Sequence, residues 1–436
     1  MLRPLLFTLL LAPAALHACP NLTPFYPGTD SDWAVVRQSL RTIFDQCLQS
    51  SEYFALLGAS ELNSGFGEDA LDSLERALLL DPDNGAAQID YAQALMSDGQ
   101  LFAALALNEQ ILDRQDLPID LAAQLERRQE RWLALTRQQE WQLDVLTGYD
   151  DNLNGAPDTE FLTLTISGEP LLLPLGEDFQ PVTGPFVNVR GVGRLRRLGP
   201  DRQHNFSAEL RGRVSGAPQS DIVQLAARYA LYRPDPERSW QLNANVNHLF
   251  FGGKPLFTGS DVSMRYQFNS ETRCSPYVTG AAQHQIWHGQ SQLNGVEAKA
   301  GVGNNCVIPG RVGLQRLTAE TSLLGNYAAS SNRLGGHRQG FQVGFNWQLQ
   351  LDRGWLQAQF VHTQLTDGRG YSPLLANGAR RKVERDILLL SYSEPVSVLG
   401  ENASVVLNVY HQVQRSNLEL FTTTNTTIEL GYSWRF

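Results

Sequence analysis

The hydrophobic pattern changes once along this chain. In the first third, apolar residues recur every three to four positions, and from Gln139 to the end they alternate with polar residues. The first spacing places apolar side chains on one face of a helix, and the second places them on one face of a β-strand. The pattern therefore predicts an all-α part over 19–138 and an all-β part over 139–436.

Residues 53–114 carry a 34-residue repeat, which is the tetratricopeptide spacing. Ala70 in the first copy corresponds to Ala104 in the second, and small residues are needed where paired helices cross closely. Because an isolated repeat cannot bury its apolar face, we expect further helices at about 31–49 and 117–137 to cap the stack.

Charge separates the two parts as well. Residues 19–138 contain 8 arginines and 19 acidic residues, whereas residues 139–436 contain 26 of each sign. The acidic helical part is consistent with a groove for a basic or amphipathic peptide. It is also consistent with a packed, well-solvated spacer, and the fold alone does not decide between them.

Segments of about ten residues with alternating polarity are typical of a transmembrane β-barrel that has a lipid-facing and a lumen-facing side. The segment 341–350 shows this alternation, and similar segments repeat to the end of the chain. We predict fourteen antiparallel strands in a closed barrel, an even number as single-chain outer-membrane barrels have. They lie near 140–150, 184–197, 204–215, 220–232, 239–251, 257–268, 273–287, 293–305, 311–325, 337–350, 354–366, 383–396, 402–415 and 425–436.

The connections predict the orientation of this barrel. The longest ones, 151–183 and 367–382, fall at the same end, and long loops are typical of the external side. Both ends of the barrel, and the helical part, are then expected in the periplasm. Six of the eight tryptophans lie near predicted strand ends, where the membrane interface favours them: Trp141, Trp240, Trp287, Trp347, Trp355 and Trp434.

The last strand carries aromatic residues at Tyr432 and Trp434 and ends in Phe436. A terminal phenylalanine on an alternating strand resembles the signal that the barrel-insertion machinery reads in outer-membrane proteins. We therefore assign Tyr432, Trp434 and Phe436 as the barrel-assembly signal.

Composition excludes several classes of protein. The 436 residues have a net charge of −10, which argues against nucleic-acid binding, and 42% of them are hydrophobic, which argues against disorder. No apolar run reaches the roughly 18 residues that a membrane helix needs. The usual hydrolase, phosphate-binding and metal motifs are absent from the sequence, so we expect no enzyme activity, no cofactor and no metal.

Residues 1–18 have the features of a secretory signal peptide. Arg3 precedes an apolar stretch, and small residues lead to Ala18, after which we expect cleavage. Because Cys19 would then be the first residue, lipidation of Cys19 is an open alternative. Both readings place the mature chain outside the cytoplasm.

Four cysteines in an oxidising compartment predict disulfides. Cys274 and Cys306 would lie opposite each other in a hairpin centred on residue 290, so we predict a cross-strand bond between them. Cys19 is able to pair with Cys47, unless Cys19 is lipidated.

The predicted second to fourth strands carry arginines at positions of the same parity, which we expect to face the lumen because charges on the lipid face are costly. One interpretation is a positive strip that lines a conduit. The other is a ladder of arginine–carboxylate pairs that braces the wall, with Glu209 as one partner. The residues are Arg190, Arg194, Arg196, Arg211, Arg213 and Arg228.

Two other polar groups are weaker candidates. His284 and His288 are four residues apart on a strand, too far apart for a shared metal, so we expect surface histidines near the outer rim. The segment 150–154 is acidic, but it lacks the glycine and glutamate of a calcium loop. We expect a turn built by Asp and Asn side chains there.

The barrel entry Gly148-Tyr149-Asp150-Asp151-Asn152-Leu153-Asn154, its long acidic loop and the preceding repeats resemble the surface lipoprotein assembly modifier family, also called type XI secretion. This resemblance implies export of a surface lipoprotein or another secreted protein. The repeats would dock the cargo, and a fourteen-stranded barrel embedded in outer-membrane lipid would conduct it. The alternatives are an exopolysaccharide export porin and a passive porin with a periplasmic assembly module.

Overall fold

The computed structural model describes residues 18–26, 32–270, 272–400 and 402–436. The expected signal peptide therefore lies outside the described residues except for Ala18. The chain divides into two compact units that meet between Thr136 and Arg137, two residues before the boundary expected from the sequence. Within the described ranges, no helix is both long and apolar enough to span a bilayer.

The first unit is a stack of helices, as the repeat predicts. Ser50 and Asn84 are equivalent N-caps 34 positions apart, and their side chains accept the backbone N–H groups of Tyr53 and Ala87. The helices are α1 (Trp33–Arg41), α2 (Ser51–Asn63), α3 (Gly67–Leu80), α4 (Gly85–Ser97), α5 (Leu101–Leu112) and α6 (Ile119–Leu135), with two short 3-10 helices, η1 (Thr23–Phe25) and η2 (Phe44–Gln46).

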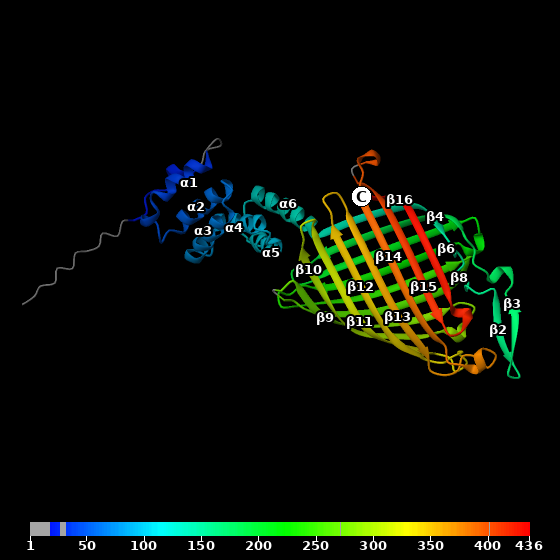
Figure 1. The fold of residues 1–436 in the computed structure, drawn as a ribbon. Helices are drawn as coiled ribbons and strands as arrows, with labels where there is room; N and C mark the ends of the chain where they lie inside the picture. Colours follow the sequence, from blue (N-terminus) through cyan, green and yellow to red (C-terminus); the bar gives the residue numbers. More distant parts are fainter. Residues whose placement is uncertain (1–17, 27–31, 271, 401) are drawn as a thin grey trace, which may run out of the picture. The chain divides into compact units, whose positions relative to one another are not determined.

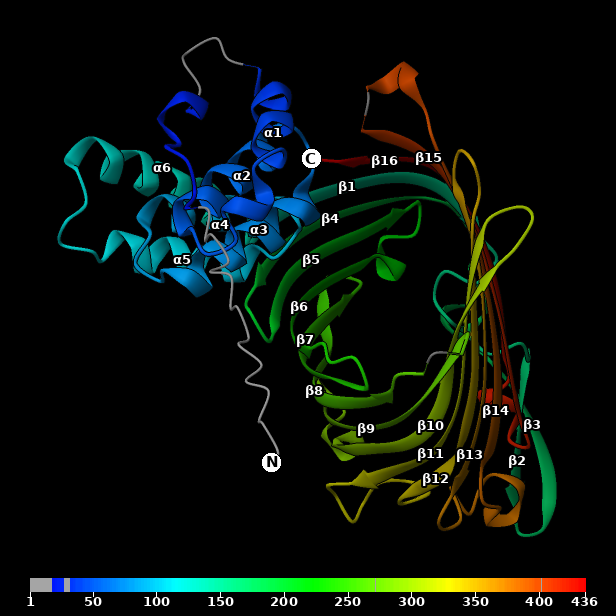
Figure 2. The ribbon, with the colours of Figure 1, turned by 90° about the vertical axis from the view of Figure 1, so that its left-hand side faces the viewer.

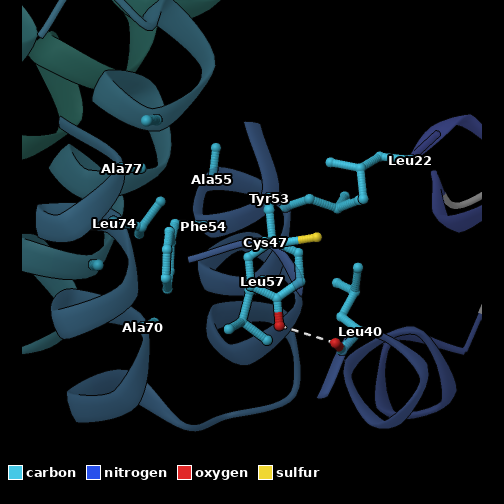
Figure 3. Close-up of a cluster of buried hydrophobic side chains, with 13 residues drawn as sticks. Leu22, Leu40, Cys47, Tyr53, Phe54, Ala55, Leu57, Ala70, Leu74 and Ala77 are labelled. Atoms are coloured by element: carbon cyan, nitrogen blue, oxygen red, sulfur yellow. Dashed lines mark hydrogen bonds between the residues drawn. The ribbon is translucent and has the colours of Figure 1, made fainter. Parts of the chain in front are cut away.

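The close helix crossing that the repeat requires occurs between α2 and α3. A Cβ atom at Gly58 would lie 2.5 Å from Leu74 Cγ, so only glycine allows these helices to approach as they do. The core beside this crossing contains Tyr53, whose hydroxyl donates a hydrogen bond to Leu40 O at 2.9 Å (Figure 3).

A disulfide joins Cys19 to Cys47 and fastens the start of the described chain to this core. Cys47 is 1% exposed, and Leu22 packs into the same cluster.

We expect Cys47→Ser to lower the free energy of unfolding of the helical unit by about 2–4 kcal/mol, because closing a loop of this size removes entropy from the unfolded chain. Urea unfolding followed by helical circular dichroism measures this. Cys274→Ser, in the barrel, is the matched control and is expected to leave that transition unchanged.

The second unit is a closed barrel of fourteen antiparallel strands in the order β1-β16-β15-β14-β13-β12-β11-β10-β9-β8-β7-β6-β5-β4 (Figures 1 and 2). Each barrel strand pairs with the barrel strands before and after it in the chain, so β1 pairs with β4, and β1 also closes the wall against β16. The bounds are β1 Arg137–Asp150, β4 Gly184–Leu198, β5 Gln203–Ser215, β6 Ile222–Arg233, β7 Arg238–Phe251, β8 Lys254–Phe268, β9 Cys274–Trp287, β10 Gly295–Pro309, β11 Leu314–Ala328, β12 Arg338–Gln350, β13 Trp355–Asp367, β14 Lys382–Pro395, β15 Ala403–Ser416 and β16 Thr423–Arg435.

Alternation gives the wall two chemically different faces. On β1, Trp141 and Tyr149 are 63% and 56% exposed on the outside, whereas Asp144 and Asp150, of the opposite parity, are buried at 7% and 1%. An apolar exterior around a polar interior is the arrangement of a membrane-spanning β-barrel.

We call the end of the barrel with Arg137 and Arg435 the terminal rim and the opposite end the loop rim. The two longest connections, 151–183 and 368–381, both lie at the loop rim, as expected. No strand was predicted within the first, but it contains a separate two-stranded sheet of β2 (Phe161–Ile166) and β3 (Glu169–Pro174), which is visible beyond the loop rim in Figure 1.

Short 3-10 helices complete the connections between the strands. They are η3 (Glu177–Phe179), η4 (Pro218–Ser220), η5 (Ser291–Leu293), η6 (Ala376–Gly378), η7 (Ser397–Leu399) and η8 (Glu419–Phe421).

Cys274 and Cys306 are directly opposite in the β9–β10 pairing and are joined by a disulfide. Both cysteines lie at the terminal-rim end of these strands. A hairpin centred on residue 290 predicts this position.

Candidate functional site

The lumen wall near the β1–β16 seam holds a dense polar network. Five of the predicted arginines contact acceptors on strands between one and three positions away in the wall. Their partners are Asp144 and Glu209 for Arg190, Glu140 for Arg194, Gln138 and Gln203 for Arg196, Glu429 for Arg211, and Asp150 for Arg213. Arg228 is exposed on the same face, in register with Ser207 and Asn245.

Arg190 shows how these contacts brace the wall. Its Nη1 contacts Asp144 Oδ2 at 3.1 Å on one side, and its Nη2 contacts Glu209 Oε2 at 2.9 Å on the other. Arg211 similarly reaches Glu429 on β16 at 3.7 Å. Four of the six predicted arginines are therefore paired with carboxylates, an arrangement that favours the bracing alternative over a positive lining.

Asp150 is the centre of this network. Its Oδ1 accepts the Asn152 backbone N–H at 2.8 Å and Asn425 Nδ2 at 2.8 Å. Its Oδ2 accepts Arg213 Nη1 at 2.9 Å and the Thr427 hydroxyl at 3.1 Å. Because β1, β5 and β16 all contribute, one carboxylate joins both sides of the seam.

The segment after Asp150 holds the long loop in place. Asn152 Nδ2 donates to Ala156 O at 2.9 Å and Thr424 O at 3.0 Å, and Asn152 Oδ1 accepts the Ala156 N–H. Asn154 donates to Gln180 O and accepts the Val182 N–H, so it ties the two ends of the loop together. These contacts form the turn expected from the sequence, and we call residues 150–154 the latch.

A cavity of about 740 Å³ lies inside the barrel against the latch. Its lining combines the latch and the arginines with amide, hydroxyl and carboxylate groups from β15 and β16, and with apolar side chains such as Leu146 and Phe186. The β15 and β16 side chains are Asn408, Tyr410, Gln412, Thr423, Asn425, Thr427 and Glu429. Such a lining offers many weak hydrogen-bonding groups and no cluster of one charge sign.

A second lumen cluster, on β8–β11, was not predicted. Tyr277 is 1% exposed, and its hydroxyl donates to Glu320 Oε2 at 3.0 Å. Lys299 Nζ contacts Glu320 Oε1 at 2.7 Å, and the Arg265 guanidinium lies 4.2 Å from the centre of the Tyr277 ring. The sequence analysis applied the every-second-residue pattern only to the second to fourth predicted strands. The same pattern, applied to the later strands, places these residues in the lumen with the arginines.

The remaining candidates lie on the outer wall or at its rims. His284 faces outward on β9, and His288 follows that strand at the loop rim. Tyr432 and Trp434 share the outer face of β16, with ring centroids 6.0 Å apart. Phe436 is 68% exposed, and its N–H donates to Trp141 O at 2.8 Å.

The helical unit contains a buried polar group that the repeat pattern did not reveal. Arg128 of α6 is 9% exposed; its Nε donates to Asn108 Oδ1 at 2.8 Å, and its Nη1 donates to Ile89 O at 3.1 Å. Burial raises the pKa of neighbouring Asp90 to about 6, and the positive charge of Arg128 opposes this shift.

This shift predicts that the helical unit loses stability as the pH rises. The carboxyl group of Asp90 has a pKa of 3.8 when unperturbed, so the folded unit holds its proton more tightly than the unfolded chain. The free energy of unfolding should fall between about pH 4 and 6 and remain lower above that range. We expect Asp90→Asn to raise it at pH 7 by about 1–2 kcal/mol. Urea titrations at several pH values measure this, with Asp72→Asn on the exposed face of α3 as the control.

No protein-family model matches the chain, and no curated protein matches it either. Among solved structures, the helical unit is similar to the type III secretion translocator chaperone SycD of Yersinia enterocolitica, with 16% identity over 23% of this chain and 71% of that one, at a TM-score of 0.21. A Pseudomonas aeruginosa FadL homologue matches at 9% identity over 68% of this chain and 90% of that one, at a TM-score of 0.39. An anion-selective porin from Comamonas acidovorans matches at 11% identity over 69% and 99%, at 0.33.

Proposed function

We propose that this chain is an outer-membrane translocator that exports or displays a protein substrate. In this proposal the terminal rim and residues 19–138 face the periplasm, the helical unit receives the cargo, and the barrel conducts it. The cargo is a surface lipoprotein or another secreted protein. The barrel-insertion machinery reads the last strand, and the chain has no enzymatic step.

The observation that carries this proposal is that one chain combines a stack of helical repeats with a β-barrel. Stacked helical repeats present extended surfaces that suit segments of polypeptide, and this stack continues directly into a membrane-spanning barrel. Its excess of acidic residues favours basic or amphipathic segments. The lumen supplies mixed, mutually compensated polar groups, which suit a polypeptide of varied sequence better than a lining of one charge sign would.

The test is a comparison of surface proteins in cells with and without this chain. Intact cells are labelled with a membrane-impermeant reagent, and the labelled proteins are quantified by mass spectrometry. We expect deletion of the chain to remove one or a few proteins from the surface while they accumulate inside. Residues 137–436 alone, directed to the periplasm, should form a heat-modifiable barrel that does not restore them.

Two outcomes would replace the proposal. Retention of a glycan inside deletion cells, with surface proteins unchanged, would indicate polysaccharide export. Rapid swelling of liposomes in small solutes, with no surface component lost from the cells, would indicate a passive porin.

A further inference from the structure

The outer wall of the barrel is hollowed along one side. A groove of about 1610 Å³ lies on the outward-facing side chains of β1 and β4–β10. Its lining includes Leu210 and Val262, each 53% exposed, and it shares the apolar character of the lipid-facing wall. The groove is therefore open to the membrane rather than to the lumen.

Strand register shows the path of this groove. A single row of directly opposed residues follows it from strand to strand: Trp141, Gly193, Ala208, Ala227, Val246, Ser260, His284 and Val296. Seven steps at the interstrand spacing give a length of about 34 Å.

The row crosses the membrane diagonally. It begins at Trp141, near the terminal-rim end of β1, and ends at Val296, the second residue of β10 at the loop rim. With strands tilted by roughly 40°, the row rises about 20 Å along the membrane normal, close to the roughly 25 Å apolar band of such barrels.

The shape of the groove follows from residue size. Ala208 and Ala227 form a floor of small residues in the row, and the Trp141 ring lies over Gly193 at the terminal-rim end of this floor. Larger side chains stand in the adjacent rows on both sides, with Leu210 on one and Phe206 on the other. A narrow apolar trough of this kind matches an extended hydrocarbon chain better than a flat protein surface.

Polar side chains occur at the loop-rim end. His248, Ser260 and His284 line the groove there, on the face that elsewhere contacts lipid. His248 Nδ1 lies 2.7 Å from the Thr258 hydroxyl, which lies 2.8 Å from His288 Nε2. Polar groups on the lipid face are tolerated best near the interface, where lipid headgroups lie.

We propose that this groove is a binding site for a membrane lipid with a phosphate-bearing headgroup. Its acyl chains lie along the small-residue floor toward Trp141, and its headgroup accepts hydrogen bonds from His248, Ser260 and His284. This site is independent of the protein cargo, because it lies on the other side of the wall from the lumen.

The first test fills the groove and measures lipid retention. The full chain, purified in detergent, is exchanged with phosphatidylglycerol or with lipid A and examined by native mass spectrometry. We expect the wild type to retain bound lipid, and the Ala208→Leu/Ala227→Leu variant to retain at least about tenfold less, since misfit by one or two methylenes has effects of that size. Ala358→Leu, on the outer face of β13, is the matched control and should retain wild-type amounts.

The headgroup contacts have their own control. His248→Ala/His284→Ala should weaken retention of both phosphate-bearing lipids relative to a neutral diacylglycerol. His411→Ala should not, although His411 is also an outward histidine bonded to a threonine hydroxyl, at 3.0 Å, on the opposite wall. The phosphatidylglycerol and lipid A arms identify which lipid is preferred.

A second measurement needs only the wild type. A phospholipid with a photoactivatable acyl chain should label Val246 and Ala227 several-fold more than Leu388 and Leu390, which face lipid on β14. Uniform labelling around the wall would overturn the proposal. A lipid-free dimer in the mass spectrum would also overturn it, because the groove would then be a protein interface.

Discussion

Replacing Asp150 with alanine should detach the 151–183 loop and weaken the β1–β16 seam. The Asp150 side chain is 2% exposed and that of its partner Arg213 is 13% exposed, so the substitution leaves a largely buried guanidinium without its carboxylate. Breaking one side of a buried ion pair costs about 3–5 kcal/mol. Asp150 also accepts hydrogen bonds from the Asn152 N–H and from Asn425 Nδ2, and both of these bonds are lost in the same step.

Proteolysis and heat modifiability measure these two effects. The loop 151–183 contains six acidic residues and no lysine or arginine, so glutamyl endopeptidase reports its release whereas trypsin does not. We expect faster loop cleavage and a lower temperature for the gel shift of the barrel. The control is Arg202→Ala, which removes an exposed pair with Asp201 at a terminal-rim turn and should have little effect.

A double-mutant cycle separates the pair from its surroundings. Asp150→Ala/Arg213→Met removes both charges and should recover much of the lost stability, because no unpaired charge remains in the wall. If Asp150→Ala behaved like Arg202→Ala, the latch would have no structural role.

The alternation of polar and apolar residues was sufficient to predict the barrel. Period-two patterning fixes which side chains face lipid, and closure follows because an open sheet edge is not tolerated in a bilayer. The same parity places Arg190 and Arg211 in the lumen. It does not identify Glu429 as a partner of Arg211, because that contact depends on how β16 closes against β1.

The β2–β3 sheet was missed because its signal is local and short. Ser167 and Gly168 both have positive φ, at 55° and 88°, the geometry of a tight two-residue hairpin. The strands on either side are six residues each, shorter than the segments of about ten residues that mark the barrel strands. β2 alternates between apolar and threonine positions, but β3 has three leucines in a row, so its pattern does not mark a strand. The groove on the outer wall is also not evident from the alternation, because alternation records the polarity of outward positions and not which small residues lie opposite each other on neighbouring strands.

The β1–β16 seam closes only if residue 431 has no side chain, and substitution of this glycine is therefore expected to reduce the yield of folded barrel. Gly431 of β16 faces the lumen directly opposite Leu146 of β1. A Cβ atom at this position would overlap Val145 O and the Leu146 Cα atom, and both belong to backbone that has no freedom to move aside. Overpacking usually costs about 1–3 kcal/mol, and more where backbone must shift. Because the β1–β16 pairing closes the wall, that strain acts directly on barrel closure.

We therefore expect Gly431→Val to reduce the folded, heat-modifiable barrel in membranes at least about fivefold, the change that roughly 1 kcal/mol or more produces. Gly344→Val is the matched control, since Gly344 also faces the lumen, on β12, and a Cβ atom there meets nothing within 4 Å. Valine favours strands, so without a clash it should be neutral or stabilising. Equal yields of the two variants would show that seam closure does not depend on the close approach of β1 to β16.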